Sequence, residues 1–172
     1  MTETSDTVKK SFRLTPFIFL GILLIWLGIR LIAPDSVSLF AGTRPDYLGV
    51  REGKLAPCPV TPNCVSSQSQ DQAHAIEPLS YQGSGEKAIE QLAKIIASQP
   101  RTKIINQDSN YLYAEFSSQW MGFVDDLEFS LNPSKNAIDV RSASRLGESD
   151  LNVNRERVET LRKLALRELL CK

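Results

Sequence analysis

The chain has 172 residues, which is enough for one domain of ordinary size and an appendage. Its 20 basic and 20 acidic residues give a formal net charge of zero, so composition offers no electrostatic case for nucleic-acid binding. One histidine and three cysteines leave little material for a zinc site, and we expect neither a metal nor another cofactor.

The N-terminal part combines a polar start with an apolar run. Residues 1–13 are polar and end in basic side chains, whereas residues 14–33 contain a single charge, Arg30. Twenty residues of helix span about 30 Å, which is the thickness of the hydrocarbon core of a membrane. Because basic residues precede the run, we expect residues 1–13 in the cytoplasm and the rest of the chain to be exported.

Two interpretations of residues 14–33 stay open. Length and flanking charges favour an uncleaved single-pass anchor in an inner or plasma membrane, with an extracytoplasmic C-terminal domain. A cleaved signal peptide also fits, because the uncharged run is short and residues 36–38, Ser-Val-Ser, have the small-x-small form of a cleavage site. The domain would then be released into a periplasm or a lumen.

The next segment mixes glycine, proline and charges without a period. We therefore expect a linker over residues 34–54 and a globular domain over residues 55–172. The linker would join the membrane segment to the domain.

The domain opens with a proline-rich loop, LAPCPVTPNCVSSQ, over residues 55–68. Two close cysteines on a stiff loop favour a disulfide between Cys58 and Cys64 in an oxidising compartment. Metal binding with His74 and a redox role are weaker alternatives, because the spacing matches neither a strong zinc pattern nor C-x-x-C. We expect Cys171 to be a free thiol.

Three elements follow the loop. Residues 75–82 are expected to form a strand. Ser84 is placed to cap a helix that ends before Pro100, and residues 102–107 form another short strand. The apolar face of the helix consists of Ile89, Leu92 and Ile96.

Residues 111–144 have the pattern of three antiparallel strands, YLYAEFS, FVDDLEFSL and AIDVRSAS, joined by short turns. Side chains alternate along a strand, so one face of this meander collects the apolar residues. Pairing Phe116 with Phe123 and Phe129 with Val140 aligns that face across all three strands. The hydrophobic pattern thus predicts the register of both hairpins.

The opposite face of the meander carries ionisable side chains on every strand. They are Tyr111, Tyr113, Glu115, Asp126, Glu128, Asp139, Arg141 and Arg145. One interpretation is a solvated face with cross-strand ion pairs, which antiparallel sheets commonly have. The other is a ligand surface in which Arg141 and Arg145 bind a carboxylate or phosphate and the tyrosines stack on the ligand.

Asp125 interrupts the apolar face between Phe123 and Leu127. A buried carboxylate must be paired or protonated, and Ser142 and Ser144 lie on the same face of the neighbouring strand. We favour a structural hydrogen-bonding role for Asp125 over that of a functional acid with a shifted pKa.

A polar turn over residues 145–154 precedes the last helix, which Asp150 or Asn152 can cap. The apolar stripe of this helix consists of Leu151, Val158, Leu161, Ala165 and Leu169. Its arginines are expected mostly outside the stripe, on a solvated face. They are Arg155, Arg157, Arg162 and Arg167.

Three stretches together resemble the family known as domain of unknown function 1499, by their order and spacing. They are LAPCPVTPNCVSSQ (55–68), MGFVDDLEF (121–129) and DVRSASRLGESDLNVNRERV (139–158). The resemblance covers about residues 55–166 and implies a small domain, commonly exported or membrane-attached, without an established reaction. The chain departs from the family at Glu148, usually a bulkier residue, and at Asn152, often a glycine.

The resemblance also carries over a set of signature positions. In this chain they are Cys58, Pro59, Asn63, Cys64, Ser66, Ser67, Asp125, Asp126, Arg141, Ser142, Ser144, Arg145, Asp150, Asn154 and Arg155. The meander would bring Asp125, the two serines of its last strand and the polar turn to one end of the sheet. If the cysteine loop docks there, a polar cleft forms.

We therefore predict an α+β domain in which two helices pack on one face of an antiparallel sheet of about five strands. An N-terminal transmembrane helix precedes it. The expected function is a non-catalytic binding or accessory module for a small anionic ligand or a protein partner, with membrane contact through residues 14–33 and no nucleic acid. The candidate binding residues are Asp125, Asp126, Arg141, Ser142, Ser144, Arg145, Asp150, Asn154 and Arg155.

Two other functions stay open. A hydrolase-like enzyme would use Asp125 or Asp126 as a base and Arg145 to hold an anion. Alternatively, the cysteine pair would do thiol–disulfide chemistry.

Overall fold

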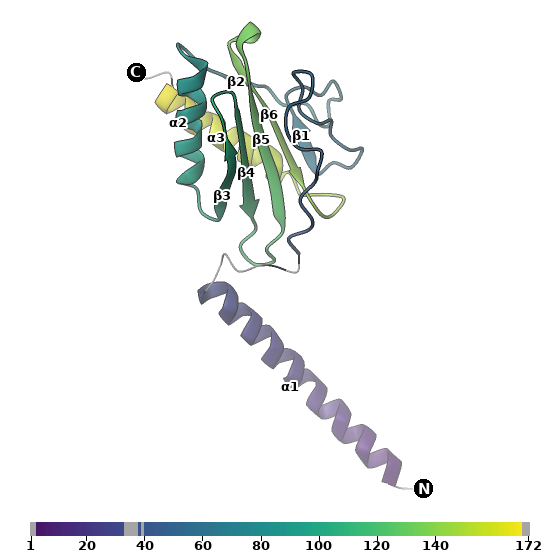
Figure 1. Ribbon diagram of the computed structural model, residues 1–172. Helices are drawn as coiled ribbons and strands as arrows, with labels where there is room; N and C mark the ends of the chain where they lie inside the picture. The colour runs from purple at the N-terminus through teal and green to yellow at the C-terminus, as the bar shows by residue number, and fades with distance from the viewer. Residues whose placement is uncertain (1–2, 33–37, 39, 170–172) are drawn as a thin grey trace. The chain divides into compact units, whose positions relative to one another are not determined.

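The computed structural model describes residues 3–32, 38 and 40–169 (Figure 1). The chain divides into two compact units, residues 1–36 and 37–172. The last residue of the predicted apolar segment, Ala33, and the third cysteine, Cys171, lie outside the described residues.

The first unit is the helix α1 (Glu3–Ile32), which confirms the predicted N-terminal apolar helix. Its stretch Thr15–Ile32 is long and apolar enough to cross a membrane, judged by length and composition. A signal sequence at this position would have the same properties. Anchor and signal peptide therefore both stay open as predictions.

The second unit contains a six-stranded antiparallel sheet, which confirms the predicted α+β class. Its strands are β1 (Cys64–Ser66), β2 (Leu79–Ser80), β3 (Thr102–Gln107), β4 (Tyr111–Ser117), β5 (Val124–Asn132) and β6 (Ala137–Ser144). The order across the sheet is β1-β6-β5-β4-β3, and β2 also pairs with β6. A short 3₁₀ helix, η1 (Pro133–Lys135), joins β5 to β6.

The two shortest strands differ from the prediction. β1 lies inside the cysteine loop, where we expected no strand, and it pairs with β6 from Cys64–Ala143 to Ser66–Arg141. The strand expected over residues 75–82 contracts to two residues, because Pro78 has no N–H for a ladder hydrogen bond. Since both strands pair with β6, the last strand of the meander is an interior strand.

One of the two predicted registers is correct and the other is shifted by two residues. Phe129 pairs with Val140 as predicted. In the first hairpin Phe116 pairs with Asp125 and not with Phe123, which lies before β5 and is 38% exposed. The reason is the turn over residues 118–123, in which the N–H of Phe123 donates to Ser118 Oγ at 2.9 Å. A shift of two residues leaves every side chain on its predicted face.

Two helices cover the apolar face of the sheet, as predicted (Figure 1). α2 (Gly85–Ala97) begins at the predicted cap, where Ser84 Oγ accepts a hydrogen bond from the N–H of Lys87. α3 (Val153–Leu169) begins after Asp150, whose carboxylate accepts the N–H groups of Asn152 and Asn154 at 3.1 and 2.7 Å. Side-chain caps of this kind stabilise a helix by about 1 kcal/mol each.

The core lies between these helices and the meander. Its largest fully buried apolar side chains are Leu79, Ile89, Leu92, Ile96, Leu112, Leu127, Phe129, Ile138, Val140 and Leu161. Gly85 packs closely here, since a Cβ would lie 2.5 Å from a Cδ atom of Leu131, which would have to shift. Leu151 was wrongly assigned to the apolar stripe, because it precedes α3 and is 85% exposed.

The turn before α3 has a left-handed backbone. Leu151 and Asn152 have φ angles of 54° and 68°, a region that glycine adopts freely and asparagine more easily than most residues. Asn152 therefore suits its position in this turn.

Residues 40–57, which we call the strap, cover the other face of the sheet. Arg44 Nη2 lies 2.6 Å from Glu115 Oε1, and the N–H of Gly49 donates to Glu128 Oε1 at 2.7 Å. Most of the strap falls in the segment predicted as a linker, but these two contacts join it to β4 and β5. Both interpretations of the ionisable face assumed an open surface, but its centre is buried, with Asp126, Glu128 and Arg141 at most 2% exposed.

Candidate functional site

The sheet divides the nine candidate residues between its two faces. Asp125, Ser142 and Ser144 face the helices, where Asp150, Asn154 and Arg155 also lie. Asp126, Arg141 and Arg145 lie on the strap side. Alternation along β5 is the cause, because consecutive aspartates point to opposite faces.

Asn154 is the centre of the helix-side network and is fully buried. Its Oδ1 accepts hydrogen bonds from Ser142 Oγ and, at 2.7 Å, from Arg157 Nη1. Its Nδ2 donates to Ser144 Oγ at 3.0 Å and to the carbonyl oxygen of Asn63 at 3.2 Å. One side chain thus joins α3 to β6 and to the cysteine loop.

Asp125 has a partner that the sequence analysis did not assign. Arg157 Nη2 donates to Asp125 Oδ2 at 2.5 Å, and its guanidinium lies 4.8 Å from the centre of the Phe116 ring. Arg157 was expected on a solvated face but points to the sheet. The pair satisfies the carboxylate on the apolar face, where an unpaired charge would be costly.

Two more arginines of α3 bind backbone carbonyls. Arg155 donates to the carbonyl oxygens of Ala75 and Ala73 at 2.7 and 2.8 Å, and Arg162 donates to that of Pro78 at 2.6 Å. Their seven-residue spacing, two helical turns, was the signal that could have placed both on one face. These contacts fasten the segment around β2 to the helix.

On the strap side, Arg145 joins three polar groups. Its Nε and Nη2 donate to Asp126 at 2.9 and 2.6 Å, and Nη2 also bonds Glu115 and, at 3.1 Å, Tyr113 Oη. Burial favours the neutral form of Glu115, but hydrogen bonds from Arg145 and Arg44 outweigh it and lower the pKa of Glu115. Burial, and then the hydrogen bond to Asp126, raise the pKa of Tyr113.

Glu128 and Arg141 form the next row of this network. Arg141 Nη1 lies 3.4 Å from Glu128 Oε2, while Tyr111 Oη donates to Glu128 Oε1 at 2.8 Å. Burial and the neighbouring Glu128 raise the pKa of Tyr111. Arg141 Nε is buried without a hydrogen-bond partner among the described residues, and the Tyr47 ring of the strap lies 5.7 Å from its guanidinium.

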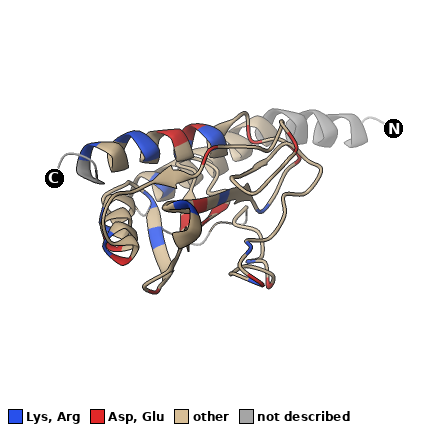
Figure 2. Ribbon diagram, turned by 90° about the horizontal axis from the view of Figure 1, so that it is seen from above, with Lys and Arg blue, Asp and Glu red and all other residues tan. Residues whose placement is uncertain are grey.

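Asp139 completes the strap-side network with neutral donors. Its carboxylate accepts from Ser67 Oγ at 3.0 Å and from the side-chain amides of Gln68 and Asn132 at 2.9 Å each. Figure 2 shows acidic and basic positions close together on the central strands. Every strap-side carboxylate described here is thus held by charged or neutral donors.

The loop cysteines form the predicted disulfide between Cys58 and Cys64, with Cα atoms 5.6 Å apart. His74, the weaker metal candidate, is buried, and its Nδ1 lies 2.9 Å from the carbonyl oxygen of Cys64. Within the described residues, no group of three or more histidine, cysteine, aspartate or glutamate side chains could hold a metal ion.

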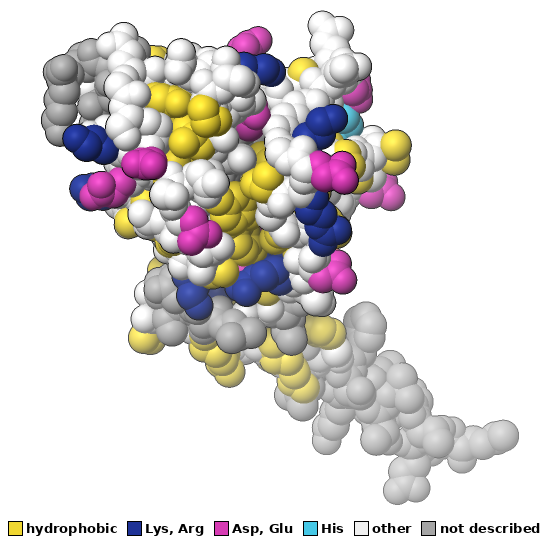
Figure 3. All heavy atoms as spheres, turned by 45° about the horizontal axis from the view of Figure 1, so that its top comes forward, with side chains coloured by type: hydrophobic (Ala, Val, Ile, Leu, Met, Phe, Trp, Pro, Cys, Tyr) yellow, Lys and Arg dark blue, Asp and Glu magenta, His cyan; other side chains and the backbone are white. Residues whose placement is uncertain are grey.

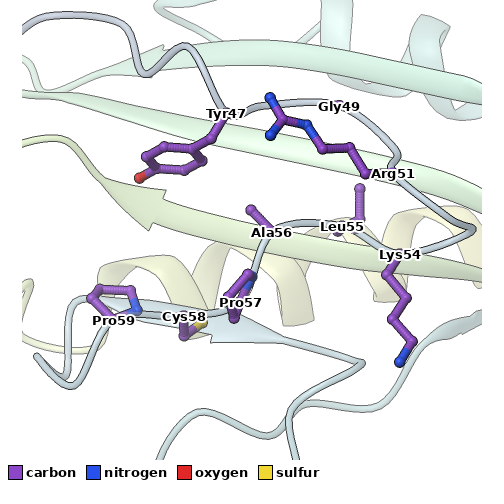
Figure 4. A pocket seen from close by; sticks show the side chains of 9 residues that line it. All are labelled: Tyr47, Gly49, Arg51, Lys54, Leu55, Ala56, Pro57, Cys58 and Pro59. Atoms are coloured by element: carbon purple, nitrogen blue, oxygen red, sulfur yellow. The ribbon is translucent and has the colours of Figure 1, made fainter.

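A pocket of about 530 Å³ opens between the strap and residues 58–64, the disulfide loop (Figure 4). Its lining residues are Tyr47, Gly49, Arg51, Lys54, Leu55, Ala56, Pro57, Cys58 and Pro59. A second pocket of about 510 Å³ shares residues 54–59 and extends to Ser66, Gln68 and His74. Figure 3 shows hydrophobic side chains along the middle of the domain surface, bordered by charged ones.

The pocket was not predicted, because four of its residues lie in the segment expected as a linker. Of the lining residues, the two that are charged, Arg51 and Lys54, are both basic. Their backbones pair with each other in a tight turn that projects both side chains. The lining combines apolar side chains, one aromatic ring and two exposed cations, Arg51 and Lys54, which we call the basic rim.

The family model for DUF1499, described as a protein of unknown function, matches residues 54–164. This range contains all six strands, the disulfide loop and most of both polar networks. Neither the curated proteins nor the solved structures that were compared gave a match. The match covers more than half of the chain, and the protein therefore belongs to the DUF1499 family.

Proposed function

We propose that this protein is a non-catalytic binding module, anchored by its N-terminal helix with the domain on the extracytoplasmic side of a membrane. The module takes a small amphipathic anion in the pocket between the strap and the disulfide loop. Its apolar part lies on the proline-rich wall, and its anionic group meets the basic rim.

The composition of the pocket carries this proposal. A volume of about 530 Å³ is in the range of small-molecule sites, which are mostly apolar with a few polar groups that set orientation. Arg51 and Lys54 favour an anion over a cation, since no acidic side chain is among the lining residues. Tyr47 adds a flat ring on which an apolar or aromatic group can stack.

The disulfide supports the location of the module. Cys58 lines the pocket and is bonded to Cys64, and such bonds persist in oxidising compartments outside the cytoplasm. A basic flank before the apolar helix favours export of everything that follows it.

Binding is favoured over hydrolysis because neither candidate base lines these pockets. Asp125 is paired with Arg157, and Asp126 with Arg145, and both aspartates are buried. A general base must lie within hydrogen-bonding reach of the group that it deprotonates. Each carboxylate is instead buried in an ion pair with an arginine, so neither is placed to accept a proton from a ligand in these pockets.

The test is the binding of naphthalene-2-sulfonate to the full chain in nanodiscs, measured by calorimetry against empty nanodiscs. We expect saturable binding, and weaker binding of the neutral naphthalene-2-methanol. Replacing both rim charges, Arg51→Gln with Lys54→Gln, should weaken sulfonate binding about tenfold, which is about 1.4 kcal/mol. Ala56→Trp should abolish binding by filling the pocket.

The matched control is Lys87→Gln with Lys135→Gln, which removes two exposed charges outside the pocket and should leave binding unchanged. Equal binding of the sulfonate and the alcohol, or equal losses in both double variants, would contradict a specific anion pocket. As a second measurement, mass spectrometry of co-purified small molecules should detect amphipathic anions with the wild type and not with Ala56→Trp.

A further inference from the structure

One end of the domain carries a group of exposed apolar side chains, which we call the apolar end. They come from the start of the strap, the turn between β4 and β5, and the residue after Arg145. The members are Phe40, Trp120, Met121, Phe123 and Leu146, between 38% and 50% exposed.

Contacts between the three segments make the apolar end continuous. The rings of Phe40 and Phe123 lie 5.6 Å apart, and Ser38 Oγ donates to the carbonyl oxygen of Met121 at 2.7 Å. Gly42 lies against Leu146, since a Cβ on this glycine would be 3.0 Å from Leu146 Cγ. Residues 117–124, SSQWMGFV, contain no charge.

We infer that the apolar end rests on the lipid surface of the membrane that anchors the chain. This inference depends on the anchor in the proposed function and not on the pocket. The occupant is the outer lipid interface, in which aromatic and large aliphatic side chains lie at the level of the headgroups.

Chain length is the reason to choose lipid over another partner. The apolar stretch of α1 ends at Ile32, and Ser38 is already bonded to the turn of the apolar end. Six residue steps reach at most about 21 Å. A tether this short keeps the lipid surface within constant reach, at a high effective concentration, whereas a separate protein must be captured from solution.

The side chains at the apolar end fit this occupant. Phenylalanine, tryptophan, methionine and leucine gain free energy by leaving water, and no carboxylate of residues 117–124 would be desolvated by the contact. Contact of the apolar end with lipid would be a second attachment beside the N-terminal helix, and it would limit the rotation of the domain about its tether.

Fluorescence quenching in nanodiscs with brominated acyl chains tests the contact. The chain has two tryptophans, so Trp26→Phe leaves Trp120 as the sole reporter. We expect bromolipid to lower Trp120 emission at least about twofold relative to unbrominated lipid. In the same background, Phe123→Ser should reduce this quenching by at least about half, because it removes an aromatic contact.

Two controls separate docking from mere proximity. A sole tryptophan at the other end of β4, from Trp26→Phe, Trp120→Phe and Ser109→Trp, should not be quenched. A flexible insertion of about 20 residues after Ser36 should preserve Trp120 quenching in the chain with Phe123 and abolish it with Phe123→Ser.

Each failure has a distinct signature. Absent quenching of Trp120 in a chain that stays in the nanodisc overturns the docking and leaves the anchor intact. Loss of the chain from the nanodisc overturns the anchor itself. Trp120 emission could also change with protein concentration while bromolipid leaves it unquenched. That result overturns the lipid assignment in favour of a second copy of the chain.

Discussion

The two faces of the sheet are closed by different means. On one face α2 and α3 bury apolar side chains, and polar contacts concentrate around Asn154, Asp125 and the arginines of α3. On the other face the strap has no regular secondary structure, and its contacts with the sheet include the ion pair of Arg44 with Glu115 and the hydrogen bond of Gly49 with Glu128.

This difference follows from backbone hydrogen bonding. A helix pairs its own N–H and C=O groups, so it needs only an apolar stripe to cover a sheet. An irregular segment must find partners for its backbone in the surface that it covers. The polar strap side supplies such acceptors, as Glu128 does for Gly49. A face rich in ionisable residues is thus no proof of an open surface.

The largest expected effect is the loss of a buried charge on the strap side. Arg141→Ala should reduce the free energy of unfolding by roughly 3–5 kcal/mol, because it leaves Glu128 buried without a cation. Urea unfolding of residues 37–172, which form their own compact unit, measures this change.

A paired variant tests the cause. Arg141→Met together with Glu128→Gln removes both charges and keeps an acceptor for Tyr111 and Gly49. It should recover at least about 2 kcal/mol of the loss. If the paired variant recovers none of the lost stability, Arg141 acts through its packing against Tyr47 and not through its charge.

The next effect belongs to the helix side. Asn154→Ala removes the partner of Ser142 and of the carbonyl oxygen of Asn63, which are buried, and of the half-buried Ser144. Leaving such groups unsatisfied should cost about 2–3 kcal/mol. Ser144→Ala, which removes one of these bonds, should cost about 1 kcal/mol in the same urea experiment. Equal losses in the two variants would show that Asn154 is not the centre of this network.

An effect of similar size is expected at the disulfide between Cys58 and Cys64, next to the strap. Cys58→Ser with Cys64→Ser opens a loop of about seven residues, for which loop entropy gives roughly 2.4 kcal/mol. The reduced wild type should unfold at the same urea concentration as this double variant, and Cys171→Ser should behave like the oxidised wild type. A reduced wild type as stable as the oxidised one would mean that the bond adds nothing to the strap side.

Alternation was enough to predict the faces of the meander and the second hairpin register, and caps with helical spacing were enough to predict the two helices. The first register was shifted, because the same apolar alignment is reached at two-residue intervals and the turn at Ser118 chose between them. A period of two residues states which side chains share a face. It contains no information on what lies above that face.

The candidate site was harder to predict for the same reason. Consecutive aspartates must separate across a sheet, so Asp125 and Asp126 could not share a cleft while β5 stayed regular. The pocket could not be foreseen, since its walls come from an irregular segment in which no period marks Tyr47 or Arg51. The disulfide was predictable, because proximity and stiffness in the sequence suffice for it.

The smallest expected effect concerns Glu115, which pairs with the half-exposed Arg44 of the strap and with the more deeply buried Arg145. Hydrogen bonds from Arg145 and Arg44 lower the pKa of Glu115 against the opposing effect of burial. A lowered pKa stabilises the fold above the ordinary value of 4.5, and this contribution is lost as the pH falls below that value. The wild type should therefore lose more stability than Glu115→Gln between about pH 6 and 3.

The size of this difference depends on exposure. The Arg44 side chain is half exposed, so solvent screens its share, and we expect a total of about 1 kcal/mol or less. Arg44→Gln should remove only part of the pH dependence, because Arg145 remains paired with Glu115 from the buried side. Parallel stability curves for the wild type and Glu115→Gln would place the acid sensitivity at other carboxylates. If Arg44→Gln removed the whole pH dependence that Glu115 contributes, the strap alone would be responsible for the pairing of Glu115.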